Sequence, residues 1–156
     1  MRWKSAGGGL YIARCSVESQ SKSCIASASA GSHGAEVTIL GLDEEAWANG
    51  LKLRLLRDFA RSLAPDTLIV AVDGYDCAFA GSGDAIRARF EALASREADA
   101  RFVLASADQT FYFRGGREGC YGERYPEAGP YRFLNSGGLA GRAAHVADTC
   151  DAALRL

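Results

Sequence analysis

The feature that most constrains the fold is a run of apolar residues from Thr67 to Val72, in which no charged side chain occurs. Aliphatic and β-branched side chains follow one another here without the polar alternation of a strand that has one face in water. A run of this kind is typical of a strand buried on both faces of a sheet. We therefore expect a central strand at these residues, with helices packed on the sheet.

The segments beside this run have the periodicity of amphipathic helices. From Trp47 to Leu63 an apolar residue recurs at every fourth position, and charged residues, Lys52 among them, occupy the other side. From Ser82 to Ser95 the apolar residues again share one helical face. The remaining segments predict strands at Gly9–Cys15, Glu36–Leu40 and Arg101–Ser106, a helix of weak propensity within Ser16–Ser32, and a last helix at Arg142–Leu156. This alternation predicts the α/β class with a mostly parallel sheet, in one domain of residues 1–156.

Composition limits the classes of partner. The chain of 156 residues is 48% hydrophobic and 24% charged, as in ordinary globular proteins, and its net charge is −1. This balance gives no reason to expect a nucleic-acid partner. No stretch approaches the roughly 20 apolar residues of a membrane span, and the first nine residues lack the apolar core of a secretory signal. The five cysteines have no CxxC spacing, which argues against a structural zinc site.

Two carboxylates, Asp73 and Asp76, follow the central apolar run directly. Ligands of open α/β sheets bind just beyond the carboxyl ends of the strands, so this is a suitable place for a site. Two acids three residues apart on a turn can direct oxygens at one hard cation, Mg²⁺ or Mn²⁺, which binds substrate phosphates in turn. The alternative is a turn in which both acids accept hydrogen bonds from backbone amides and Gly74 supplies an unusual φ.

A second candidate lies in the glycine-rich segment Arg132 to Gly141. Its adjacent glycines let the backbone approach a ligand closely, and Asn135 and Ser136 offer donors and acceptors for sugar hydroxyls. The segment is neither a Walker A loop nor a dinucleotide-binding fingerprint, because it lacks the closing Lys-Ser/Thr and follows no first strand. The alternative is a plain glycine-rich turn before a helix.

Taken in chain order, these segments resemble the glycosyltransferase domain of the procollagen lysyl hydroxylase/glycosyltransferase (PLOD-like) family, over about Gly9 to Ala144. The Asn-Ser-Gly-Gly segment with an upstream Tyr-Pro is the more specific part, since the aspartate pair occurs in many glycosyltransferases. The matching segments are Leu40–Glu45 with Trp47, Gly50–Leu56, Val72–Asp76, Ala105–Asp108, Tyr125–Glu127 and Arg132–Gly138.

The resemblance implies a GT-A-like (Rossmann-like) three-layer sandwich and a transferase that uses a UDP-sugar, UDP-galactose or UDP-glucose. By resemblance, Asp73 and Asp76 bind Mn²⁺ or Mg²⁺, Tyr75 stacks on the uracil and Trp47 lies against the nucleotide. The segment Asn135, Ser136, Gly137 and Gly138 would line the donor-sugar pocket. The implied acceptor is a hydroxyl group, such as hydroxylysine or its galactosyl derivative in collagen-like protein, and the family works in the secretory pathway. No catalytic base is identified.

Alternatives stay open for several of these residues. Trp47 is otherwise a core aromatic and Tyr75 a half-buried turn residue. Lys52 could reach a phosphate, although a basic residue on a helix face is more often merely solvated.

The family's distal acidic segment and its histidine metal ligand have no counterpart in this sequence. One alternative is therefore a domain truncated at its C-terminus: a non-catalytic nucleotide-sugar-binding remnant, or a fragment of a larger glycosyltransferase/lysyl hydroxylase, for which an oligomer or a longer polypeptide would cover exposed apolar residues. Another is a small α/β domain that serves protein interaction and has the aspartates in a simple turn.

Overall fold

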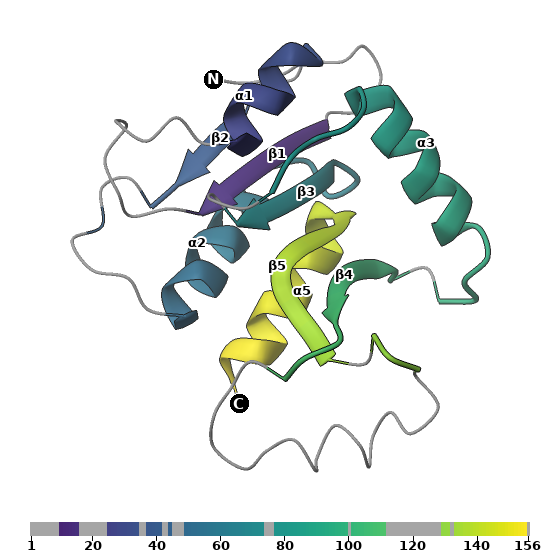
Figure 1. Cartoon of the computed structure of the whole chain (residues 1–156). Coiled ribbons are helices and arrows are strands. Elements are labelled where there is room, and N and C mark those ends of the chain that lie inside the picture. Colours follow the sequence, from purple (N-terminus) through teal and green to yellow (C-terminus); the bar gives the residue numbers. More distant parts are fainter. Residues whose placement is uncertain are drawn as a thin grey trace.

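The computed structural model describes residues 10–15, 25–34, 37–41, 44, 49–73, 77–99, 101–111, 129–131 and 133–155. No helix in these ranges is long and apolar enough to cross a membrane. The elements, in chain order, are β1 (Leu10–Cys15), α1 (Ile25–Ser32), β2 (Val37–Leu40), α2 (Asn49–Arg61), β3 (Leu68–Asp73), α3 (Gly83–Ala94), β4 (Val103–Asp108), β5 (Phe133–Arg142) and α5 (Ala143–Leu154) (Figure 1).

The strands form one sheet in the order β2-β1-β3-β5-β4. Strand β1 pairs in parallel with β2 and β3, whereas β5 runs antiparallel to both of its neighbours, β3 and β4. The predicted α/β class is confirmed. The expected mostly parallel sheet is not: in the described residues the sheet is mixed, with a parallel part and an antiparallel part. The antiparallel part arises because residues 133–142, which suggested a glycine-rich turn, form a strand inserted beside β3 (Figure 1).

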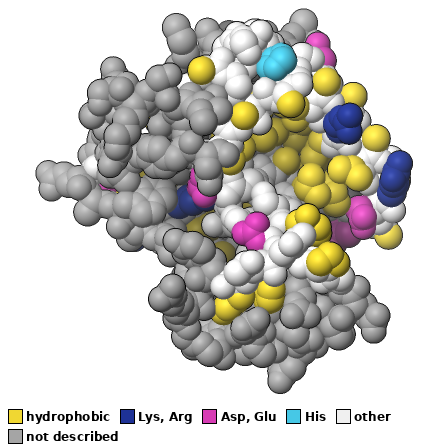
Figure 2. Space-filling view, in the orientation of Figure 1, with side chains coloured by type: hydrophobic (Ala, Val, Ile, Leu, Met, Phe, Trp, Pro, Cys, Tyr) yellow, Lys and Arg dark blue, Asp and Glu magenta, His cyan; other side chains and the backbone are white. Residues whose placement is uncertain are grey.

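Side chains of β3 alternate between two apolar layers. Ile69 and Ala71 pack with residues of α2 and α5, while Leu68 packs against Phe90 of α3, with Val70 beside them. Leu68 and Ile69 are both fully buried, and each such side chain contributes about 2 kcal/mol of hydrophobic stabilisation. The expectation that this strand is covered on both faces is confirmed. Figure 2 shows apolar side chains gathered beside α3 in a shallow hollow.

Arg142 links the end of β5 to the α3 side of the sheet. Its guanidinium donates to the Glu91 carboxylate at 2.5 Å and to the Asp66 carbonyl at 3.0 Å, and it lies 5.8 Å from the centroid of the Phe90 ring. A planar guanidinium suits such simultaneous contacts, because its donors lie in one plane and its face stacks on aromatic rings. These contacts hold the point where the chain passes from β5 into α5.

Cys150 lies in the layer between α2 and α5 and is 1% exposed. Burial raises the pKa of its thiol from 9.0 to about 11. Because the thiol ionises near 9.0 in the unfolded chain, it favours folding below that pH, and the advantage is lost as pH rises through about 11.

We predict that the free energy of unfolding falls by about 2 kcal/mol through this group as pH rises from about 8 to about 11. Urea unfolding across this range measures the fall, and Cys150→Ala serves as the reference because it removes the thiol. A pH slope in Cys150→Ala equal to that of the wild type would contradict the assignment.

Candidate functional site

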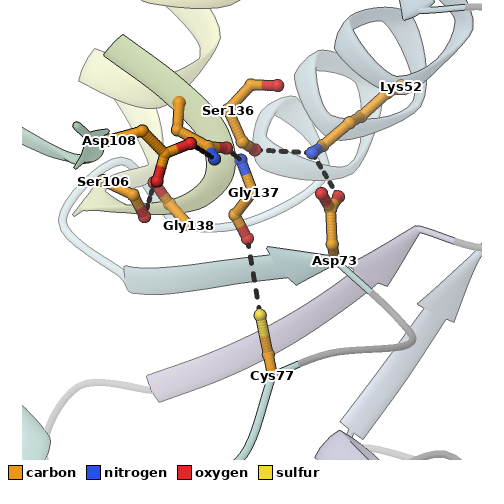
Figure 3. A network of polar contacts seen from close by, with 9 residues as sticks. Lys52, Asp73, Cys77, Ser106, Asp108, Ser136, Gly137 and Gly138 are labelled. Atoms are coloured by element: carbon orange, nitrogen blue, oxygen red, sulfur yellow. Dashed lines mark hydrogen bonds and ion pairs between the residues drawn. The ribbon is translucent and has the colours of Figure 1, made fainter. Parts of the chain in front are cut away.

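Several polar side chains of the described residues come together at the carboxyl end of β3, where α2 and β5 also meet. Asp73 is the last residue of β3, and it forms an ion pair with Lys52 in the first turns of α2. The ammonium group of Lys52 also donates to the carbonyl oxygen of Ser136 in β5 at 2.5 Å (Figure 3). One ammonium group therefore connects a helix and two strands.

Lys52 is only 8% exposed, so the interpretation that it is a solvated residue on the polar face of its helix is wrong. It lies four residues before Leu56 and eight before Ala60, two of the most buried residues of α2. These positions share one helical face, and Lys52 extends that face beyond the apolar core to the end of β3. A buried ammonium needs a partner, and Asp73 supplies it.

Strand β5 bulges where it passes Asp73. Gly138 still pairs with Val72 of β3, but on the other side the pairing with β4 jumps from Leu139 to Asn135 between two consecutive β4 residues. Residues 136–138 are thus left out of the ladder with β4, as in a β-bulge, which redirects the backbone next to a functional site.

At both glycines of this bulge a side chain would displace neighbouring polar groups. A Cβ added to Gly137 would lie 2.8 Å from Asn135 Oδ1 and 3.1 Å from Asp73 Oδ2, and a Cβ on Gly138 would collide with Ser106 Oγ. The adjacent glycines noted in the sequence therefore permit a bulge inside a strand, where the alternative considered was a turn before a helix.

A chain of hydrogen bonds holds the bulge on its β4 side. The Asn135 amide donates through Nδ2 to the carboxylate of Asp108, and its Oδ1 accepts from the Gly137 backbone N–H at 2.5 Å. The hydroxyl of Ser106 donates to the carbonyl oxygen of Gly138 at 3.2 Å (Figure 3). Cys77, which follows the predicted metal-binding turn, lies with its thiol 3.8 Å from the carbonyl oxygen of Gly137.

The structure brings together five of the predicted site residues from β3 and β5. These are Asp73, Asn135, Ser136, Gly137 and Gly138. Asp76, Tyr75 and Trp47 lie outside the described residues, so their predicted roles stay predictions.

Sequence reasoning missed the part played by two charged residues. The signal for Lys52 was its spacing from Leu56 and Ala60 on the buried face of the helix. Asp108 stands in one of the segments that carried the family resemblance, but that resemblance assigned it no role. Its place opposite Asn135 depends on the pairing of β4 with β5, which the sequence alone does not show.

In the described part of this site, the Asp73 carboxylate fits a hard cation. The Asp73 side chain is 43% exposed, and its Oδ2 atom, which has no hydrogen-bond partner among the described residues, is turned toward Gly137. A half-exposed carboxylate oxygen is the ligand type that Mg²⁺ and Mn²⁺ prefer. Within the described ranges no three His, Cys, Asp or Glu side chains gather to hold a metal. Asp73 is thus the one predicted ligand whose surroundings are defined.

We predict that Asp73→Asn lowers the free energy of unfolding by about 2 kcal/mol, because it leaves the buried Lys52 ammonium without its countercharge. The value lies between those for exposed and fully buried ion pairs, since Lys52 is buried and Asp73 half-exposed. The double variant Lys52→Met/Asp73→Asn should regain most of the loss.

Urea unfolding of the wild type, both single variants and the double variant measures this coupling. Asp99→Asn is the matched control, because its partner Arg101 is 76% exposed and such a surface ion pair contributes little to stability. Equal stability of Asp73→Asn and the wild type would show that Lys52 does not depend on Asp73.

Comparison with known protein families identifies the family of the chain. It matches the model of the PLOD glycosyltransferase (GT) domain over residues 17–153, which is well over half of the 156 residues and includes the whole site described above. The resemblance noted in the sequence is confirmed, and the chain belongs to this family. No curated protein matches the chain.

Proposed function

We propose that this member of the PLOD glycosyltransferase-domain family is a metal-assisted hexosyltransferase that binds its UDP-sugar donor at the carboxyl end of β3. The observation that supports the proposal most is the placement of Asp73 beside the Asn135–Gly138 bulge. The proposed cation ligand and the proposed sugar-binding groups thereby lie at one point of the α/β fold, although they are far apart in the sequence. Family membership supports transferase chemistry in general.

In this proposal Asp73 and Asp76 hold Mn²⁺ or Mg²⁺. When bound, the ion neutralises charge on the diphosphate of the departing UDP. The chain's own groups at this point do electrostatic and positioning work: Lys52 holds one oxygen of Asp73, which orients the other oxygen toward Gly137. The bulge brings backbone and amide groups close to the same place.

Tyr75 and Trp47 would bind the nucleotide, the first by stacking on the uracil. The donor would be UDP-galactose or UDP-glucose. The acceptor would be a hydroxyl group, and hydroxylysine or galactosylhydroxylysine of a collagen-like protein is the first to test.

A second candidate is a domain of the same family that binds a nucleotide-sugar without transferring it. The ion pair between Lys52 and Asp73 favours it, because the ammonium already neutralises the carboxylate that a cation would use. Binding and transfer must therefore be measured separately.

We predict that the chain binds UDP only in the presence of Mn²⁺. Calorimetric titration measures this, once with equal Mn²⁺ in cell and syringe and once with chelator. Lys52→Met/Asp73→Asn should weaken binding about tenfold or more, because it removes a metal ligand without stranding the buried charge. Asp99→Asn should bind as the wild type does.

Transfer is measured next, as release of UDP from UDP-galactose and UDP-glucose with hydroxylysine-containing peptides. Donor binding with no acceptor-dependent UDP release would leave the second candidate standing. A folded wild-type chain that binds no UDP with Mn²⁺ would contradict both.

A further inference from the structure

We propose that Asp108 is a positioning residue for the donor sugar, which acts by fixing the side-chain amide of Asn135. The inference rests on the proposed function, in which Asn135 and the bulge at residues 136–138 border the sugar. Nothing in the sequence or in the family match assigns Asp108 a role. The two hydrogen bonds of the Asn135 amide, to Asp108 and from Gly137, assign this role.

The amide of Asn135 has one orientation that satisfies both of its neighbours. The Asp108 carboxylate only accepts hydrogen bonds when ionised, so it takes the Nδ2 group of Asn135. The backbone N–H of Gly137 only donates, so it takes Oδ1, at 2.5 Å. Turning the amide over would place two acceptors against each other at Asp108 and two donors at Gly137. Asp108 therefore determines which end of the amide faces the bulge.

This orientation decides what kind of group can lie beside Gly137. Asn135 Oδ1 and Asp73 Oδ2 are 2.8 Å and 3.1 Å from the one point where a Cβ on Gly137 would be. Both atoms are acceptors, so a ligand group that approaches these two oxygens beside Gly137 has to be a hydrogen-bond donor or a cation. A sugar hydroxyl fits this requirement, whereas a phosphate oxygen would face two oxygens. Asp108 should therefore influence the sugar more than the nucleotide.

The placement of these residues suits a positioning role. Asp108 and Asn135 come from neighbouring strands, β4 and β5, and both are partly buried. A hydrogen bond from an amide to an ionised carboxylate is stronger than one between neutral groups, and side chains on strands are held more firmly than those on loops. Removing such a supporting residue typically weakens the site it supports by 10- to 100-fold.

The experiment compares Asp108→Ala, which removes the acceptor, with Asp108→Asn, which retains an acceptor oxygen for Asn135 Nδ2. Affinities for UDP, UDP-galactose and UDP-glucose are measured with Mn²⁺ present. We expect Asp108→Ala to weaken binding of the sugar nucleotide that the wild type prefers about tenfold, and to change UDP binding less than about twofold. Asp108→Asn should retain most of the sugar-nucleotide affinity. Asp99→Ala, which removes an exposed carboxylate near the start of the same strand, should change none of these affinities.

A readout that needs no ligand is the side-chain amide signal of Asn135 in ¹H–¹⁵N spectra. Its protons should exchange with solvent faster in Asp108→Ala than in the wild type, and not in Asp99→Ala. Unchanged exchange, or equal loss of UDP and UDP-sugar affinity in Asp108→Ala, would overturn the role of Asp108 while leaving the proposed function intact. A wild-type chain that binds no UDP would instead overturn the proposed function, and this inference with it.

Discussion

The site depends on a single buried ammonium group. Lys52 lies among apolar residues of α2, and the cost of burying its charge is offset by the Asp73 carboxylate and the Ser136 carbonyl oxygen. Because these partners belong to β3 and β5, the contact sets the distance between the end of the central strand and the bulge beside it. The Asp73 oxygen without a hydrogen-bond partner among the described residues and the glycines of the bulge take their relative positions from this contact and from the pairing of β3 with β5.

The antiparallel strand β5 explains how a late segment of the chain reaches the ligand-binding edge of the sheet. In a purely parallel sheet only the residues after each strand meet at that edge. Here β5 runs the other way, so its first half, with Asn135 and the glycines, lies next to the last residues of β3. The register shift against β4 then turns the backbone of residues 136–138 out of the ladder. The donor pocket proposed above is thus built on strands of the sheet, which position a site more precisely than loops do.

Much of the fold was predictable because it follows from periodicity. The apolar run that became β3, the four-residue repeat of α2 and the flanking helices all appear at or within a few residues of their expected bounds. Residues 133–142 were not recognised as a strand, because glycines interrupt the pattern and the strand is held by pairing with β3 and β4, a non-local interaction. Lys52 was assigned to the solvent side, because a charged residue at the edge of an apolar stripe gives no local sign of an ion-pair partner 21 positions away. Asp73 was singled out from the sequence as a metal ligand, because its position after a buried strand is visible there, and this role stays a prediction.

The central claim is that a cation and a nucleotide meet at Asp73, and paramagnetic broadening tests it most directly. Mn²⁺ added to the ¹⁵N-labelled chain with UDP broadens the signals of the nuclei nearest to it, and Mg²⁺ with UDP provides the diamagnetic reference. The account predicts that the Asn135 side-chain amide and the Gly137 and Gly138 backbone amides broaden first. Broadening that begins around other carboxylates, such as Asp58 and Asp151 between α2 and α5, while the Asn135 signal stays sharp, would contradict it.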